Sequence, residues 1–194
     1  MKTYQVITPA STYPISLTEA KSHLKVDTTA DDTYIESIIK AATQLSEEYT
    51  NRFFIDTVIE QYASSFEELE TLFKSKVSSV AHVKYYDSDN TLQTLSASVY
   101  DAQLNYEPSQ IQLVDGQSFP DITKRNDAVL VRYTVGYGSA ASDVPEIIKQ
   151  AILLTIGNFY QNRNSVVIGR IATELPQNVK WLLDTYKVQI IGWQ

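Results

Sequence analysis

The sequence predicts an α+β protein, a bundle of three to four helices that carries an inserted antiparallel β section. Two segments, 31–50 and 145–160, repeat apolar residues at three- and four-residue steps, as the buried face of a helix does. Between them, residues 53–135 contain short β-branched and aromatic runs separated by turn-forming clusters. The chain has 194 residues, enough for one domain with a substantial core. We therefore expect a single domain over residues 1–194.

The first helix is predicted from a capping pattern. Ser16 and Glu19 have the spacing of a capping box, in which each side chain bonds the backbone amide of the other residue. A short helix from Leu17 to about Lys25 follows from this pattern. The sections expected along the whole chain are an extended arm (1–14), a helical part (15–52), a mainly β part (53–135), a second helical part (144–186) and a tail (187–194).

The second helix is expected to begin at Asp31 or Asp32, where a carboxylate suits the exposed amide groups and the helix dipole. Asn51 is expected to end it. The residues that this spacing places toward the core are Ile35, Ile38, Ile39, Ala42, Leu45 and Tyr49.

The middle of the chain is expected to form antiparallel strands. Residues 87–90 read as a turn, which makes the two flanking runs a hairpin. Segment 66–73 is compatible with either a helix or a strand. The predicted strands are 57–62, 81–86, 91–95, 99–104, 110–114 and 128–135.

The second helical part begins at Pro145, which suits the first position of a helix. This helix is apolar on most sides, so we expect it to be the central buried helix. Pro176 is expected to open a last helix. The core-facing residues of the Pro145 helix are Ile148, Ala151, Ile152, Thr155, Ile156 and Phe159.

Composition argues against several classes of function. The chain has no cysteine and only two histidines, His23 and His82, neither at metal-ligand spacing, so no metal site is expected. No arrangement typical of nucleophilic catalysis is present, and we expect no enzymatic activity and no cofactor. The net charge of −7 argues against a general grip on nucleic-acid phosphates. No apolar run is long enough for a signal peptide or a membrane helix.

Two motifs suggest other functions and are weighed here as alternatives. Residues 136–141 match the dinucleotide-binding pattern G-x-G-x-x-A, but the helix starts only near Pro145, and Asp143 would compete with a phosphate. The two N-terminal helices could form a helix–turn–helix, but Asp31 and Asp32 would repel DNA phosphates.

The apolar end of the chain has two interpretations. It is either folded back onto the core or offered to a partner, for example as a strand added to a neighbour's sheet edge. Both remain open on sequence alone. The apolar residues concerned are Val188, Ile190, Ile191 and Trp193.

Segments 14–52 and 133–163 together resemble the head–tail connector (adaptor) proteins of tailed bacteriophages and prophages. The resemblance rests on the order and spacing of PISLTEAKSHLKVD, EYTNR, YTVGYG, VPEIIKQAILL and NFYQNR. The branch that the chain resembles is the gp8-like family of a Burkholderia phage, related to the gp6-like head–tail connectors. The chain departs from the pattern of this family in segment 63–78 and beyond Tyr186.

The resemblance implies a structural virion protein that forms a ring, typically of twelve subunits, under the portal protein. Such a ring extends the DNA channel, with DNA only as passing cargo, and docks a tail or stopper component. It implies no membrane contact, a place at the head–tail interface of the virion, and the host cytoplasm before assembly. The implied core lies in the helices, at Ile35, Ile38, Ile39, Ile148, Ile152 and Phe159. The implied contact residues are Arg163, Val166, Val167, Ile168 and Arg170, with Val188, Ile190, Ile191 and Trp193 of the tail.

Two other functions are kept as alternatives. One is a different virion protein, such as a tail-completion or stopper protein, which a mostly β-barrel structure would favour. The other is a small nucleotide- or ligand-binding module that uses Gly136–Ala141, which a parallel sheet would favour.

Overall fold

The computed structural model describes residues 3–69, 71–163 and 175–188. Within them the chain divides into two compact units. The β unit contains the described residues of 1–10, 56–137 and 188–194, and the helical unit contains those of 11–55 and 138–187. The helical and β sections expected from the sequence are thus each compact.

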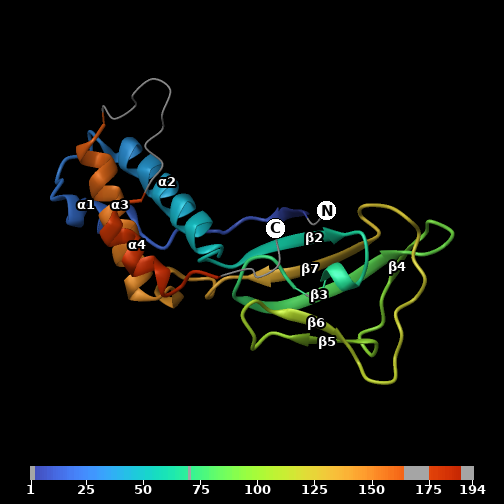
Figure 1. The fold of residues 1–194 in the computed structure, drawn as a ribbon. Coiled ribbons are helices and arrows are strands. Elements are labelled where there is room, and N and C mark those ends of the chain that lie inside the picture. Colours follow the sequence, from blue (N-terminus) through green and yellow to red (C-terminus); the bar gives the residue numbers. More distant parts are fainter. Residues whose placement is uncertain (1–2, 70, 164–174, 189–194) are drawn as a thin grey trace. The chain divides into compact units, whose positions relative to one another are not determined.

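The helical unit contains four α-helices in its described residues, packed together as one group (Figure 1). The helices α2 and α3 pack against each other, and α1 and α4 each pack against both. This number agrees with the prediction of three to four helices. The bounds are α1 Leu17–Leu24, α2 Asp32–Thr50, α3 Glu146–Gln161 and α4 Gln177–Asp184, with a 3-10 turn η2 at Ala141–Asp143.

The helix ends follow the local chemistry of the sequence. The capping box is confirmed: Ser16 Oγ accepts from the Glu19 amide at 3.2 Å, and Glu19 Oε2 accepts from the Ser16 amide at 2.8 Å. Asn51 ends α2 in a left-handed conformation with φ of 56°, which asparagine tolerates better than most residues. Pro145 lies at the N-cap of α3, one position before the one predicted.

The helix α3 packs against α1, α2 and α4, as expected of the central helix of this unit, but not all of its apolar residues are buried. Its core face is buried as expected, but Ile147 is 44% exposed and Leu154 is 36% exposed, while Phe159 is only half-buried. The apolar face of α3 is wider than the part of the helix surface that the neighbouring helices cover. The buried residues of α3 are Ile148, Ala151, Ile152, Thr155 and Ile156.

The β unit is built on a five-stranded sheet in the order β1-β2-β7-β3-β4, in which every neighbouring pair is antiparallel (Figure 1). A separate hairpin pairs β5 with β6. The predicted hairpin around residues 87–90 is confirmed as β3–β4. The bounds are β1 Thr3–Thr8, β2 Thr57–Ala63, β3 Val77–Tyr86, β4 Leu92–Thr94, β5 Tyr100–Gln103, β6 Gln110–Leu113 and β7 Val129–Val135.

Segment 66–73, compatible with helix or strand from its sequence, contains the 3-10 turn η1 at Glu67–Leu69 and is held by a buried side chain of the sheet. The Gln61 amide accepts from the Phe73 N–H at 2.8 Å and donates to the Thr71 carbonyl at 3.2 Å. The Tyr133 hydroxyl lies 2.7 Å from Gln61 Oε1. Because these polar groups satisfy each other, they can be buried within the apolar core.

The N-terminal arm, expected over residues 1–14, contains strand β1. Thr3 pairs with Tyr62 and Tyr4 with Gln61, so this part of the arm is the edge of the sheet. Its residue types, TYQVIT, favour strands, and β2 provides the edge on which it pairs.

Candidate assembly surfaces

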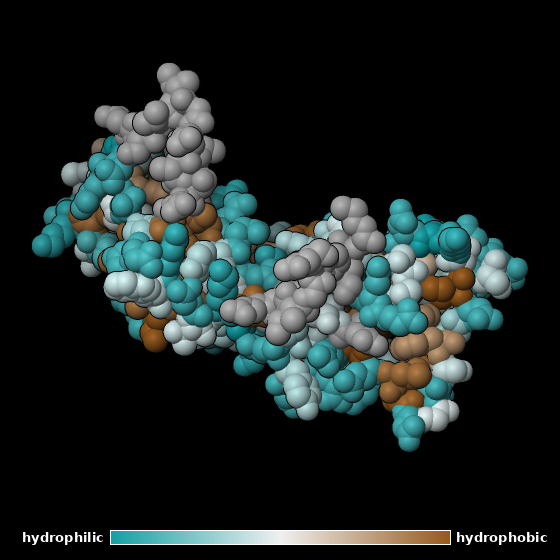
Figure 2. Space-filling model, in the orientation of Figure 1, coloured by the Kyte–Doolittle hydropathy of each residue, from teal (hydrophilic) through white to brown (hydrophobic). Residues whose placement is uncertain are grey.

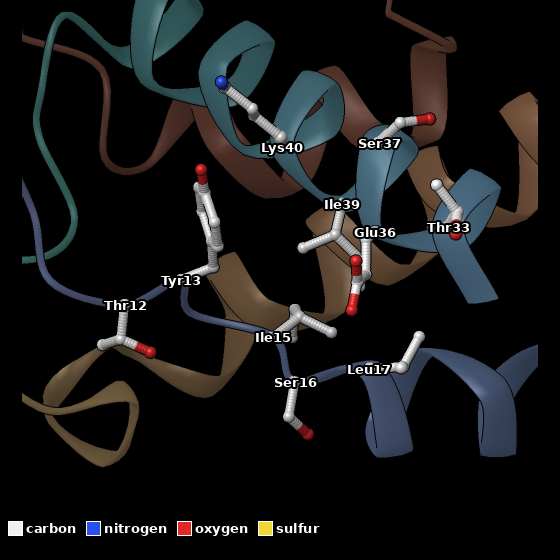
Figure 3. Close-up of a pocket in the computed structure, with 10 residues that line it drawn as sticks. All are labelled: Thr12, Tyr13, Ile15, Ser16, Leu17, Thr33, Glu36, Ser37, Ile39 and Lys40. Carbon is white, nitrogen blue, oxygen red and sulfur yellow. The ribbon is translucent and has the colours of Figure 1, made fainter.

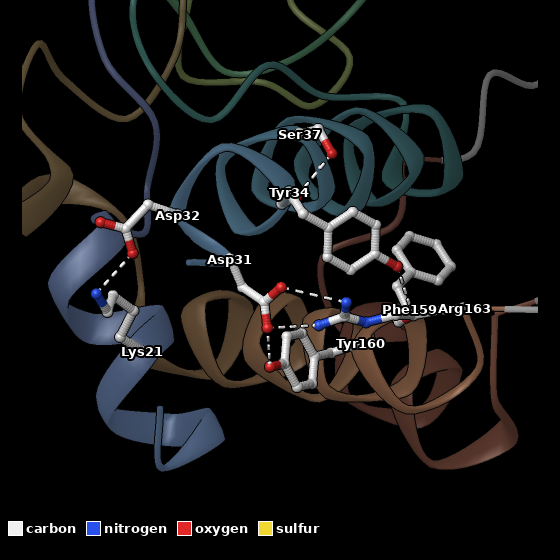
Figure 4. A network of polar contacts seen from close by, with 8 residues as sticks. All are labelled: Lys21, Asp31, Asp32, Tyr34, Ser37, Phe159, Tyr160 and Arg163. Atoms are coloured by element: carbon white, nitrogen blue, oxygen red, sulfur yellow. Dashed lines mark hydrogen bonds and ion pairs between the residues drawn. The ribbon is translucent and has the colours of Figure 1, made fainter. Parts of the chain in front are cut away.

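Arg163, predicted from the resemblance to contact a partner, is anchored within the helical unit at the C-terminal end of α3 (Figure 4). Its guanidinium makes two hydrogen bonds to the Asp31 carboxylate, at 3.2 Å to Oδ1 and 2.7 Å to Oδ2. It also lies over the rings of Tyr34 and Tyr160, 4.5 Å and 4.4 Å from their centroids. Arg163 therefore fixes the end of α3 to the start of α2, directly before the predicted contact loop.

The electrostatics of this cluster stabilise the charged forms of the ion pair. Asp31 also accepts a hydrogen bond of 2.6 Å from the Tyr160 hydroxyl. The hydrogen bonds from Arg163 and Tyr160 lower the pKa of the Asp31 carboxyl below its usual value. Asp31 in turn raises the pKa of Tyr160.

The expectation that a carboxylate caps α2 is wrong for Asp31. This residue occupies the N-cap position, but its side chain makes no capping hydrogen bond. A guanidinium offers a stronger, charge-assisted pair than a backbone amide does. Asp32 binds Lys21 Nζ at 2.6 Å and so joins α1 to α2. These intramolecular pairs give both acidic residues a structural role, which argues against the helix–turn–helix alternative.

Of the other predicted contact residues, the structure describes only Val188. Val188 is buried, with 8% of its surface exposed. The remaining predicted contact residues, Val166, Val167, Ile168, Arg170, Ile190, Ile191 and Trp193, lie outside the described residues.

A groove opens on the helical unit between residues 12–17 and the N-terminal half of α2 (Figure 3). Its volume is about 500 Å³. The buried side chains of Ile15 and Ile39 line it, and Tyr13, Glu36 and Lys40 are exposed at its border. This combination of apolar lining and polar border is typical of a protein-binding surface.

The helical unit also exposes apolar side chains. Trp181 on α4 is 68% exposed, because Val179 and Leu183, on either side of it in sequence, occupy the buried face of this short helix. Ile147 and Leu154 are exposed on α3. Figure 2 shows hydrophilic residues over most of the visible face, with small apolar groups between them. Sequence reasoning missed Trp181, although an aromatic residue out of phase with an apolar stripe is a recognisable signal.

In the β unit, strand β1 is an exposed sheet edge. Five of its six residues are exposed, among them Val6 and Ile7. The strand has no charged side chain, whereas natural edge strands often carry charges that discourage pairing. This edge is therefore a second candidate surface for binding another protein.

His82 lies among polar side chains of neighbouring strands in the sheet rather than at a metal site. Its Nε2 atom is 4.0 Å from Glu60 Oε2, and Glu60 also binds Arg132 at 2.8 Å. Burial is the main cause that lowers the pKa of His82. Burial and the hydrogen bond to Glu60 raise the pKa of Tyr62 to about 12.

The turn at residues 136–141 does not have the geometry of a dinucleotide site. The strand before it, β7, belongs to an antiparallel sheet, whereas that site requires parallel strands. Asp143 Oδ2 accepts from the Ala140 amide at 3.0 Å, and a Cβ on Gly138 would collide with the same carboxyl group. A carboxylate thus stands beside the turn where a phosphate would need amide groups.

Within residues 3–69, 71–163 and 175–188, no group of three or more His, Asp or Glu side chains is placed to hold a metal ion. None of the helices in this part of the chain is long and apolar enough to cross a membrane.

The described residues thus form a helical unit and an antiparallel sheet unit, with several exposed apolar side chains. The family model described as "Phage gp6-like head-tail connector protein" matches residues 14–114, more than half of the chain. The chain belongs to the phage gp6-like head–tail connector family. The resemblance to head–tail connectors seen in the sequence is confirmed. The role of this protein is that of a structural connector.

Solved structures with the same fold come from gene transfer agent (GTA) particles. A chain in "Neck of empty GTA particle computed with C6 symmetry" has a TM-score of 0.78 at 18% identity. Chains in "Virion of native gene transfer agent (GTA) particle" and "Neck of native GTA particle computed with C12 symmetry" have TM-scores of 0.75 and 0.76, at 20% and 19% identity. In each case 98% of both chains is covered. No curated protein sequence gives a significant match.

Proposed function

We propose that this connector assembles as a ring, twelve-fold on the portal protein, at the head–tail interface of a phage or prophage particle. The ring extends the DNA channel and provides the docking surface for a tail or stopper component. The observation that carries this proposal is the likeness of the whole chain to a chain in a neck described as having C12 symmetry. The role is structural and involves no catalysis. The subunit is made in the host cytoplasm and functions in the virion.

A closed ring requires two different patches on each subunit, which meet around the circle. Such contacts can be weak in solution and become stable when a portal ring supplies a high effective concentration. We therefore expect assembly to depend on the portal, and a monomer in isolation agrees with the proposal.

The predicted contact loop and the tail keep their proposed roles, with two changes. Arg163 supports the base of the loop through Asp31, so it acts on partner binding through position rather than direct contact. Val188 is buried within the subunit, so it anchors the start of the tail instead of contacting a partner. The proposed contacts to portal or tail components are Val166, Val167, Ile168 and Arg170 of the loop, and Ile190, Ile191 and Trp193 of the tail.

The alternative of a stopper with a mostly β-barrel structure has no support in this fold. The described residues include a unit of four helices and an open sheet with edges at β1 and β4. The ligand-binding alternative is disfavoured by the antiparallel sheet at residues 136–141.

The test is the mass of the purified protein, alone and with its cognate portal, measured by light scattering at low and high salt. A complex stoichiometric with the portal, resolved as a twelve-fold ring by electron microscopy, supports the proposal. A protein that stays monomeric and does not bind the portal at either salt concentration contradicts it.

A further inference from the structure

Strand β1 is held in the β unit with little buried surface. Five of its six residues are exposed, and Tyr4 is half-buried. The ring of Tyr4 lies 6.1 Å from that of Phe73, and Lys74 Nζ lies 5.9 Å from the Tyr4 centroid. Attachment therefore depends on backbone pairing with β2, while hydrophobic burial, the dominant favourable term in folding, contributes little. An edge segment of this kind opens at a lower free energy than the core strands do.

The segment that joins β1 to the helical unit has the properties of a hinge. Residues 9–13 are all exposed, and within the described part of the chain no hydrogen bond holds them. The register of the β1–β2 pair also shifts between Val6 and Thr8, directly before this segment. The next residues, Pro14 and Ile15, are buried and belong to the helical unit. The chain can therefore change direction at residues 9–13 while the helical unit keeps its packing.

The edge of β2 that β1 covers is matched to this strand. Five residue pairs set the register, from Thr3 opposite Tyr62 to Thr8 opposite Val58. All residues of β2 are buried or half-buried, and its one charged side chain, Glu60, is held in an ion pair. Without β1, this edge would lack the free charges that discourage pairing with other strands. It therefore needs a strand to cover it, and β1 is the strand that is known to fit.

We propose that copies of the chain exchange β1 in the ring, so that β1 of one copy pairs with β2 of the next. The inference rests on the proposed function, which brings copies together. A second copy is the occupant that the structure favours, because the observed register shows that this strand fits this edge. The pairs that open within a subunit form again between subunits, which makes exchange a low-cost route to an oligomer. Each copy donates one strand and accepts one, as the heterologous contacts of a closed ring require.

The absence of cysteine allows a direct test of strand exchange. Thr8 and Val58 lie directly opposite each other, at an exposed and a half-buried position, so cysteines there are close enough for a disulfide. The single variants Thr8→Cys and Val58→Cys are mixed, assembled on the portal and oxidised. We expect disulfide-linked heterodimers in the rings. The same mixture without the portal should give none, because the strand of the same subunit then has the higher effective concentration.

A lock on β1 is the second test. The double variant Thr8→Cys/Val58→Cys is oxidised before assembly, which links β1 to β2 of the same copy. We expect it to form no rings on the portal until a reductant is added. The matched control is Asp101→Cys/Gln112→Cys, which links directly opposite, exposed positions of β5 and β6. This disulfide places no constraint on β1, so the oxidised control should assemble like the parent.

The outcomes separate this inference from the proposed function. If the parent chain forms no ring with the portal, the proposed function fails and the exchange fails with it. If rings form, but the locked variant assembles like the parent and no heterodimers appear, the exchange is overturned while the proposed function stands. If the locked variant forms no rings and no heterodimers appear, β1 opens to admit a strand of the portal, which also overturns exchange between copies.

Discussion

Arg163 shows how a single side chain can link parts of a fold that lie far apart in sequence. It joins α3 to Asp31 at the start of α2, more than a hundred residues earlier, and two tyrosine rings flank its guanidinium. Arginine suits this position because its planar group can bind a carboxylate with two hydrogen bonds and stack on aromatic rings together. The loop that follows thus starts from a fixed point.

The Asp31 pair predicts a pH dependence of stability. Because the pKa of Asp31 is lower in the folded than in the unfolded protein, its contribution is fully present above the unfolded value, about 3.9, and is lost as the pH falls toward the folded value. Asp31→Asn removes this contribution. The difference in unfolding free energy between parent and variant should be largest near pH 7 and shrink below about pH 4.

This prediction is measured by urea denaturation of both proteins at several pH values. The matched control is Asp115→Asn, an exposed aspartate in the turn after β6. A parent-to-variant difference for Asp31 that stays constant from pH 7 to pH 3 would contradict the assigned role.

At the scale of secondary-structure elements, the predictions that depend on residues close together in sequence were confirmed. The Ser16–Glu19 capping box and the Asn51 stop depend on residues a few positions apart, and both are present. The two strands around residues 87–90 also follow from adjacent residues. What could not be predicted was how much of each element its neighbours would cover, as Ile147 and Leu154 show.

The capping box predicts a measurable loss of stability in Ser16→Ala. The variant removes the acceptor for the Glu19 amide, and such losses usually cost about 1 kcal/mol of unfolding free energy. Ser22→Ala, an exposed position within the same helix, is the control and should be neutral or slightly stabilising. Equal effects of the two substitutions in urea denaturation would show that the cap does not contribute.

At the scale of the whole molecule, the net charge affects how strongly the connector binds DNA. A net charge of −7 gives little general attraction to phosphates, as suits a channel through which DNA slides. We expect no retardation of duplex DNA in a gel-shift assay at about 0.15 M salt, for the free protein or the portal-bound ring. Salt-dependent binding of DNA at this concentration would contradict the proposal that DNA is only passing cargo.

The candidate surfaces were predicted only in part. The loop after α3 and the apolar tail came from the family resemblance, whereas the groove of residues 12–17 and α2, Trp181 and the β1 edge came from the structure. Exposure of an apolar side chain is a property of the packed molecule, so periodicity alone does not reveal it. Trp181 could have been suspected only from its position between two core-facing residues.

The sequence by itself determined the α+β class, three to four helices with the Ser16–Glu19 capping box and the Asn51 stop, and most of the strands, because capping, periodicity and turn chemistry act over a few residues. The connector family followed from the resemblance to known connectors. Only the tertiary structure decided the strand order β1-β2-β7-β3-β4, the pairing of the N-terminal arm, and the anchoring of Arg163 by Asp31. These contacts join residues far apart along the chain. Which of them form depends on how all the elements pack at once, since each buried polar or apolar group must find its partner in the same arrangement.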